Sequence, residues 1–189
     1  MFNNCTSLTT APELPATTLT RYCYYSMFSG CTSLTTAPEL PATTLINWCY
    51  YSMFSGCTSL TTAPELPSTT LIPYCYGQMF QDCTSLTTAP ELPATTLVSN
   101  CYQYMFQNCK KLQLVTTYAT ILNTSYASNW LNGAGTEAFN PTVFCPANSN
   151  IATGNYSGIP NDWQRSEIGS DSIVPPEYLE DYNLGLADG

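Results

Sequence analysis

Residues 31–41 read Cys-Thr-Ser-Leu-Thr-Thr-Ala-Pro-Glu-Leu-Pro, and the same eleven residues recur unchanged at 5–15, 57–67 and 83–93. A Met-Phe pair at 27–28 also recurs, always at an interval of 26 residues. A fifth copy begins at Cys109 but diverges at once. Such strict periodicity is typical of stacked supersecondary units, none of which can bury its apolar face alone.

The part of the unit before the cysteine predicts a short helix. Four apolar residues lie at i, i+3, i+4 and i+7, the spacing of one helical face: Tyr24, Met27, Phe28 and Cys31. The residue before the cysteine differs among the five copies, in order Asn4, Gly30, Gly56, Asp82 and Asn108. These residue types tolerate the left-handed backbone best, so the spacing predicts that the helix ends there.

The part after the cysteine predicts a short strand over Ser33–Ala37, which Pro38 ends because proline cannot donate to a β-ladder. The residues expected to fill the core are Phe28, Leu34, Leu40, Leu45 and their equivalents 26 positions away. The predicted fold is an α/β solenoid, a right-handed coil of 26-residue units with one short parallel strand and one short helix per unit.

The pattern Cys-x-x-Leu-Thr-x-x-x-Pro, preceded by a helical turn that ends in Phe, resembles the BspA-type (Treponema-type) leucine-rich repeats of bacterial surface proteins. The resemblance covers residues 1–112, and the segment 143–163 is similar to the ends of such arrays. The units differ from the commoner form in their greater length and their Pro-Glu-Leu-Pro insertion. The resemblance implies a leucine-rich-repeat fold and cell-surface adhesion to host or bacterial partners. It implies no catalytic residue.

The chain divides into three predicted parts: a repeat solenoid at 1–112, divergent C-terminal capping rungs at 113–165 and an acidic tail at 166–189. The capping part contains a candidate helix at 120–131 and a candidate strand at 142–144. Terminal repeats must be atypical because they cover the open end of the core. From Ser166 onward there are six acidic residues and no basic one, which is typical of a tail.

Charge is sparse and acidic. Charged residues make up 9% of the chain, with four basic and thirteen acidic side chains, no histidine and a net charge of −9. A nucleic acid or an anionic membrane surface would need a basic footprint that the sequence lacks. There is no run of about 18 apolar residues that could span a bilayer. Without histidine, the usual general base and most zinc sites are missing, so we expect neither an enzyme nor a cofactor.

The cysteines and glutamates each recur in columns. Cys23 and Cys31 are separated by a helical turn, which is too far for a disulfide, and parallel side chains of one column suit the bond poorly. Buried free thiols are the favoured interpretation, and disulfides or a metal site are the alternatives. Glu39 and its equivalents are expected to form an exposed row; the alternative is a divalent-cation site that relieves their repulsion.

The copies differ most in the segment around the second cysteine column. Exposed Tyr and Trp are preferred anchors of interfaces, so we expect any binding site on this helix-side edge. Its candidate residues are Arg21, Tyr22, Tyr25, Trp48, Tyr51 and Tyr74. The alternative is that these positions vary because they are exposed, or that the rings pack partly between rungs.

These observations predict a non-enzymatic binding or adhesion module of a bacterial surface protein, with protein or glycan partners on host or neighbouring cells. The alternative is a structural spacer or fibre segment of a cell-surface or virion assembly. Met1 and Phe2 coincide with the repeated Met-Phe pair, so we expect the chain to be a fragment. The missing signal peptide then says little about location, and the resemblance implies the cell surface or secretion. An open first rung would favour end-to-end self-association.

Overall fold

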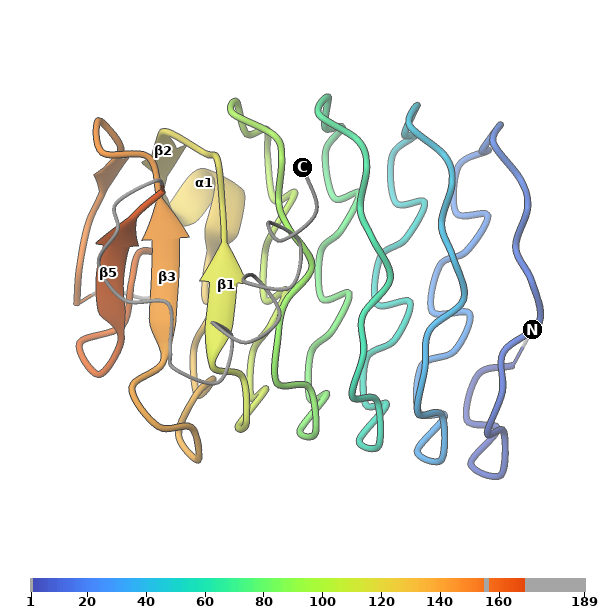
Figure 1. The fold of residues 1–189 in the computed structure, drawn as a ribbon. Coiled ribbons are helices and arrows are strands. Elements are labelled where there is room, and N and C mark those ends of the chain that lie inside the picture. Colours follow the sequence, from blue (N-terminus) through green and yellow to red (C-terminus); the bar gives the residue numbers. More distant parts are fainter. Residues whose placement is uncertain (1, 155–156, 169–189) are drawn as a thin grey trace, which may run out of the picture.

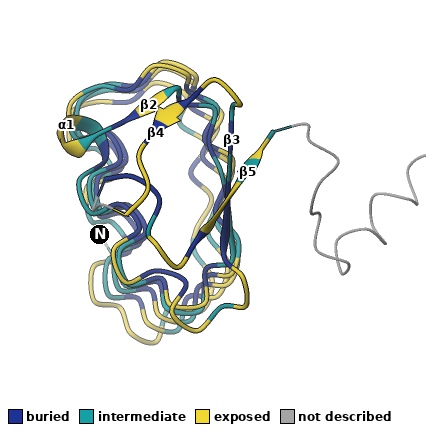
Figure 2. Cartoon of the chain, turned by 90° about the vertical axis from the view of Figure 1, so that its left-hand side faces the viewer, coloured by how far each residue is buried: buried dark blue, intermediate teal, exposed yellow. Residues whose placement is uncertain are grey.

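The computed structural model describes residues 2–154 and 157–168. The chain winds through a stack of similar coils along one axis, a solenoid-like repeat fold (Figure 1). Viewed along that axis, each coil is a flattened ring (Figure 2). Strand β3 (Thr142–Cys145) lies on one long side of the ring and helix α1 (Thr124–Ala127) on the opposite side. We name these the strand side and the turn side.

Parallel pairings run along the strand side from coil to coil. In the first coils they are single bridges between threonines 26 positions apart, in the order Thr10, Thr36, Thr62 and Thr88. Thr88 then bridges to the start of β1 (Leu114–Thr116). β1, β3 and β5 (Gln164–Glu167) form one parallel sheet in that order. A second parallel sheet joins β2 (Ile121–Leu122) to β4 (Asn150–Ile151).

The strand predicted over Ser33–Ala37 is too long. The N–H of Leu34 donates to the carbonyl of Cys31 in a tight turn, and Pro38 has no N–H to donate. The extended stretch is thus limited at both ends, and Thr36 is the residue that bridges to the neighbouring coils.

The helix predicted in each repeat is wrong, because the turn side forms a chain of tight turns instead. Alternate N–H groups close these turns on the carbonyl three residues back, as Met27 does to Tyr24 and Cys31 does to Phe28. The N–H groups between them donate to the next coil, as Phe28 does to Met53 at 2.9 Å. Among the described residues, α1 is the one α-helix.

Left-handed residues explain why no helix forms. Every fourth residue of the turn side has a positive φ, as at Trp48 (63°), Ser52 (52°) and Gly56 (75°). An α-helix needs right-handed φ at every residue. Each left-handed residue therefore ends the helical turn before it. The left-handed conformation predicted before the cysteines is confirmed in all five copies: Asn4, Gly30, Gly56, Asp82 and Asn108.

Columns of identical side chains fill the interior. The predicted core residues are buried from the second coil on, with exposed fractions of 0% for Phe28 and Leu34 and 3% for Leu40, whereas Phe2 and Leu8 of the first coil are partly buried. Phenylalanine rings of successive coils stack almost parallel, and the centroids of Phe54 and Phe80 lie 5.7 Å apart. The apolar area of each unit is buried mainly against its neighbours, so contacts between coils stabilise the fold.

All ten cysteines are free thiols, and eight of them are buried, in agreement with the favoured interpretation; Cys5 is exposed and Cys23 is partly buried. In one column the thiols donate hydrogen bonds across coils, as Cys57 Sγ does to the carbonyl oxygen of Phe28 at 3.1 Å. Burial raises the pKa of Cys57 to about 12 and that of Cys49 to about 11. These two thiols are therefore protonated and unreactive at neutral pH.

Two tryptophans close the C-terminal coils. Trp130 follows Phe106 in the aromatic column, but its ring is tilted by 60° at a centroid distance of 6.5 Å, which ends the parallel stack. Its Nε1 donates to the carbonyl oxygen of Gly158 at 2.7 Å. Trp163 lies over the following coil, and its Nε1 donates to Ala134 at 3.2 Å.

Two predictions for this region can be compared with the elements. The strand predicted at 142–144 is confirmed by β3. The helix predicted at 120–131 is reduced to α1, whose N-terminal end is capped by the Asn123 side chain accepting from the N–H of Ser125 at 2.9 Å. The division into three parts stays a prediction, and its acidic tail lies outside the described residues from 169 onward.

Candidate functional site

The six residues predicted as a binding site lie on the turn side, in three successive coils. They are Arg21, Tyr22 and Tyr25 of the first coil, Trp48 and Tyr51 of the second, and Tyr74 of the third. We call this set the aromatic cluster. Each of its five rings contacts at least one ring from a neighbouring coil.

The rings of the aromatic cluster form two rows along the stack. Trp48 and Tyr74 stack with centroids 3.9 Å apart and planes 8° apart, and Tyr22 extends this row at 6.1 Å from Trp48. Tyr25 and Tyr51 form the second row, stacked at 5.4 Å. A contact between Trp48 and Tyr51 at 4.7 Å joins the two rows. The structure therefore brings all five predicted rings together.

The cluster is packed between coils and still reaches the surface. Tyr22 and Tyr25 have exposed fractions of 47% and 39%, and Trp48, Tyr51 and Tyr74 are partly buried. Inter-coil packing, which was one alternative for these rings, therefore coexists with surface exposure.

One row of the cluster stands on strained backbone. Tyr22, Trp48 and Tyr74 have φ values of 62°, 63° and 61°. The left-handed conformation costs a bulky residue on the order of 1–2 kcal/mol. The fourth coil has Asn100 at the same position with φ 54°, and asparagine tolerates this backbone better. Aromatic residues thus occupy positions where the same turn accepts a less strained residue.

Gly77 completes the cluster, and the sequence did not reveal its role. It stands in the third coil where Tyr25 and Tyr51 stand in the first two. A Cβ at Gly77 would lie 2.7 Å from Cε2 of Tyr51, so the missing side chain lets the tyrosine ring lie against the backbone. Burial, followed by the proximity of Tyr25 and Tyr74, raises the pKa of Tyr51 to about 12. The variation at this position was visible, but the direction of the ring was not.

Arg21 gives the cluster a cation. Its guanidinium carbon lies 5.4 Å from the ring centroid of Tyr22, a cation–π contact. Within the described residues the recorded ion pair joins Lys110 and Glu137 at 3.9 Å, and Arg21 takes part in none. The charge of Arg21 is therefore available to a partner.

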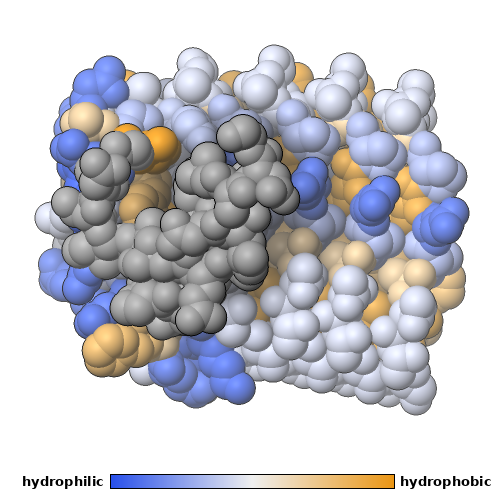
Figure 3. Space-filling model, in the orientation of Figure 1, coloured by the Kyte–Doolittle hydropathy of each residue, from blue (hydrophilic) through white to orange (hydrophobic). Residues whose placement is uncertain are grey.

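The glutamates form an exposed row beside the strand-side bridges. Hydrophilic residues recur at regular intervals there, next to more apolar surface (Figure 3). A hollow of about 410 Å³ lies between Glu39 and Glu65, lined also by Ala37, Ala63 and prolines. In the part of the chain that the structure describes, no group of three or more His, Cys, Asp or Glu side chains could hold a metal ion. The divalent-cation alternative therefore gains no support.

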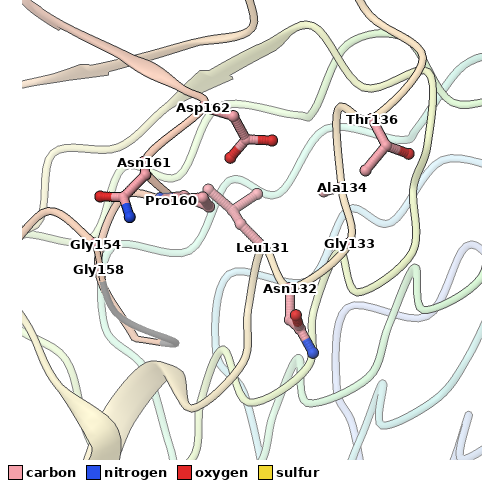
Figure 4. Close-up of a pocket in the computed structure, with 10 residues that line it drawn as sticks. All are labelled: Leu131, Asn132, Gly133, Ala134, Thr136, Gly154, Gly158, Pro160, Asn161 and Asp162. Carbon is pink, nitrogen blue, oxygen red and sulfur yellow. The ribbon is translucent and has the colours of Figure 1, made fainter.

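A cavity of about 360 Å³ opens near the C-terminal coils (Figure 4). Its polar lining includes Asn132, Thr136, Asn161 and Asp162, all of which are exposed. Asp162 is the one ionisable side chain among its lining residues. The polar groups point in different directions rather than toward a common centre (Figure 4). They therefore do not converge on one ligand position.

The comparisons with known proteins give one result. The BspA type leucine rich repeat region matches residues 1–130 in six copies, which is more than half of the 189 residues. No curated protein and no solved structure matches the chain. None of the helical segments in the described residues has the length and hydropathy of a membrane span. The chain belongs to the BspA-type leucine-rich-repeat family.

Proposed function

We propose that the chain is a non-enzymatic binding or adhesion module of a bacterial surface protein, which recognises a protein or glycan partner through the aromatic cluster. Membership of a leucine-rich-repeat family supports a repeat protein that binds. The observation that carries the proposal is the gathering of five aromatic rings from three coils, three of them on strained backbone, at the surface. Strain of this kind is concentrated at functional sites.

The cluster is suited to binding because its rings are fixed before a partner arrives. Trp48 lies between rings of the preceding and following coils, so few rotamers remain to be ordered on association. Tyr and Trp provide large, rigid contact areas with few rotatable bonds. Such a surface loses little conformational entropy when it is covered.

Two finer statements belong to the same proposal. The array is a right-handed coil of 26-residue units, and it works at the cell surface or after secretion. The repeat period in the sequence and the family support both statements.

The test replaces cluster residues by those that the fourth coil already has at the same positions. The variant carries Trp48→Asn, Tyr51→Gln and Tyr74→Asn, copied from Asn100 and Gln103. Wild type and variant are compared on immobilised matrix proteins and on a glycan array. We expect the variant to lose at least about tenfold in affinity, because aromatic anchors dominate interfaces.

The matched control is Phe139→Ala, which removes an aromatic side chain that is 80% exposed and outside the cluster. It should bind as wild type does, and both variants should keep the wild-type circular dichroism. Equal binding by wild type and the cluster variant would show that the cluster is not the binding surface.

The second candidate function is a structural spacer in a cell-surface or virion assembly. It is favoured by the unbroken aromatic column, in which stacked phenylalanines run from Phe2 to Phe106 with centroid distances of 5.6–5.7 Å. A spacer needs this continuity but no ligand. Absence of binding by the wild type to every probe would favour it.

A further inference from the structure

We infer that the partner is a protein segment that presents a carboxylate to Arg21 and apolar side chains to the ring edges of the aromatic cluster. This inference rests on the proposed function and narrows its partner from protein or glycan to protein. Two observations support it. The faces of the central rings are covered, and several polar groups of the cluster have no hydrogen-bond partner within the described residues.

The central rings have both faces covered. Trp48 lies between Tyr22 of the coil before and Tyr74 of the coil after, at centroid distances of 6.1 and 3.9 Å. Tyr51 has Tyr25 stacked on one face and the backbone of Gly77 against the other. A sugar ring that stacks on an aromatic side chain needs a free face. The central part of the cluster therefore offers edges and not platforms.

Ring edges carry partial positive charge, because the quadrupole of an aromatic ring is negative on its faces and positive at its rim. Polar hydrogens add to this character. The described residues provide no hydrogen-bond partner for the hydroxyls of Tyr22 and Tyr25 or for Nε1 of Trp48. Arg21 adds a full positive charge that no acidic side chain of the described residues neutralises. The cluster thus offers three hydrogen-bond donors and one positive charge to a partner.

A carboxylate is the complementary group for this surface. It accepts two hydrogen bonds from a guanidinium in parallel, which gives both strength and orientation. The cluster has a single cation, which is too few for the repeated phosphates of a nucleic acid or an anionic membrane. The apolar parts of the ring edges need apolar contacts, and these a protein side chain supplies directly.

The experiment screens a random-peptide phage library against the immobilised full chain, in parallel with a glycan array that includes sialylated and uronic-acid glycans. We expect enriched peptides that combine Asp or Glu with apolar residues. Synthetic versions of these peptides should lose at least about tenfold in affinity on Arg21→Ala, with partial recovery in Arg21→Lys. They should lose as much on the triple variant and nothing on Phe139→Ala.

Three outcomes would overturn the inference. Enriched peptides without a carboxylate, or with affinities that Arg21→Ala leaves unchanged, would contradict the role of Arg21. Binding of a glycan but of no peptide, lost in the triple variant, would refute the protein partner and leave the proposed function standing. If neither the peptides nor the glycans distinguish wild type from the triple variant, the proposed function and this inference both fail. Melting temperatures of all variants show whether each one is folded.

Discussion

The buried thiols define how single residues respond to pH. Burial raises the pKa of Cys49 and Cys101 to about 11 and that of Cys57 to about 12, from 9.0. Between pH 9 and these raised pKa values, the native protein holds thiol protons that the unfolded chain has lost. Stability that comes from these thiols is therefore fully present below pH 9 and falls as the pH rises through the native pKa values.

We predict that the urea midpoint of unfolding is constant from pH 7 to 9 and then decreases toward pH 12. Replacing Cys57 by Ala should make this decrease smaller, because one titrating group is removed. A midpoint that stays flat up to pH 12 would contradict the raised pKa values.

The same burial predicts which thiols react. Cys5 is exposed and Cys23 partly exposed, while the other eight are buried. We expect a thiol reagent at neutral pH to label Cys5 first and Cys23 more slowly, and to reach the others only after denaturant is added. Mass spectrometry of the labelled peptides gives the order, and rapid labelling of Cys83 in the native protein would contradict it.

Substitutions at two glycines distinguish the effect of backbone conformation from the effect of the space available to a side chain. Gly56 has φ 75°, and a Cβ there would make an ordinary van der Waals contact with the Gly30 backbone at 3.6 Å, so Gly56→Ala should destabilise the fold by about 1–2 kcal/mol through the backbone alone. Gly77 has no such φ, but its Cβ would meet the Tyr51 ring at 2.7 Å. Gly77→Ala should stay within about 1 kcal/mol of wild type, since reduced freedom of the unfolded chain offsets the moved ring.

The two variants also differ in spectroscopy. Gly77→Ala should change the near-ultraviolet circular dichroism, because Tyr51 is pushed out of its stack with Tyr25. Gly56→Ala should leave that signal unchanged. A changed signal in Gly56→Ala together with an unchanged signal in Gly77→Ala would show that the position of the Tyr51 ring does not depend on Gly77.

At the scale of the element, the turn side shows what the sequence could not decide. Tyr50, Met53 and Phe54 are buried as the helical spacing predicted. Over eight residues, a turn that repeats every four positions buries the same side chains as a helix with 3.6 residues per turn. The helix is excluded by the left-handed backbone at Trp48 and Ser52. Neither residue type predicts such a backbone from the sequence.

The strand-side leucine gives a prediction about packing between elements. Leu60 is completely buried between coils, so Leu60→Ala should destabilise the protein by about 2–5 kcal/mol. Its neighbour Thr61 is exposed, and Thr61→Ala should change stability by less than about 1 kcal/mol. Urea unfolding followed by circular dichroism measures both, and similar effects of the two substitutions would contradict the inward direction of the leucine.

At the scale of the whole molecule, the stack depends on how it ends. Trp130 is fully buried, and it covers the last ring of the phenylalanine column. We predict that Trp130→Ala costs about 3–5 kcal/mol and exposes apolar surface at Phe106. Increased binding of a hydrophobic dye would report this exposure, and Phe139→Ala serves as the exposed control. Wild-type stability of Trp130→Ala would mean that the column needs no closing ring.

The sequence by itself determined the stacked repeat, the buried columns, the left-handed positions before the cysteines and the list of candidate rings. It could do so because identical side chains at a constant interval must align when units stack. The tertiary structure alone decided that the turn side is not helical, that Gly77 receives Tyr51, and that the central rings of the aromatic cluster present edges. These properties depend on contacts between coils, which join residues 26 positions apart and leave no trace in the local spacing.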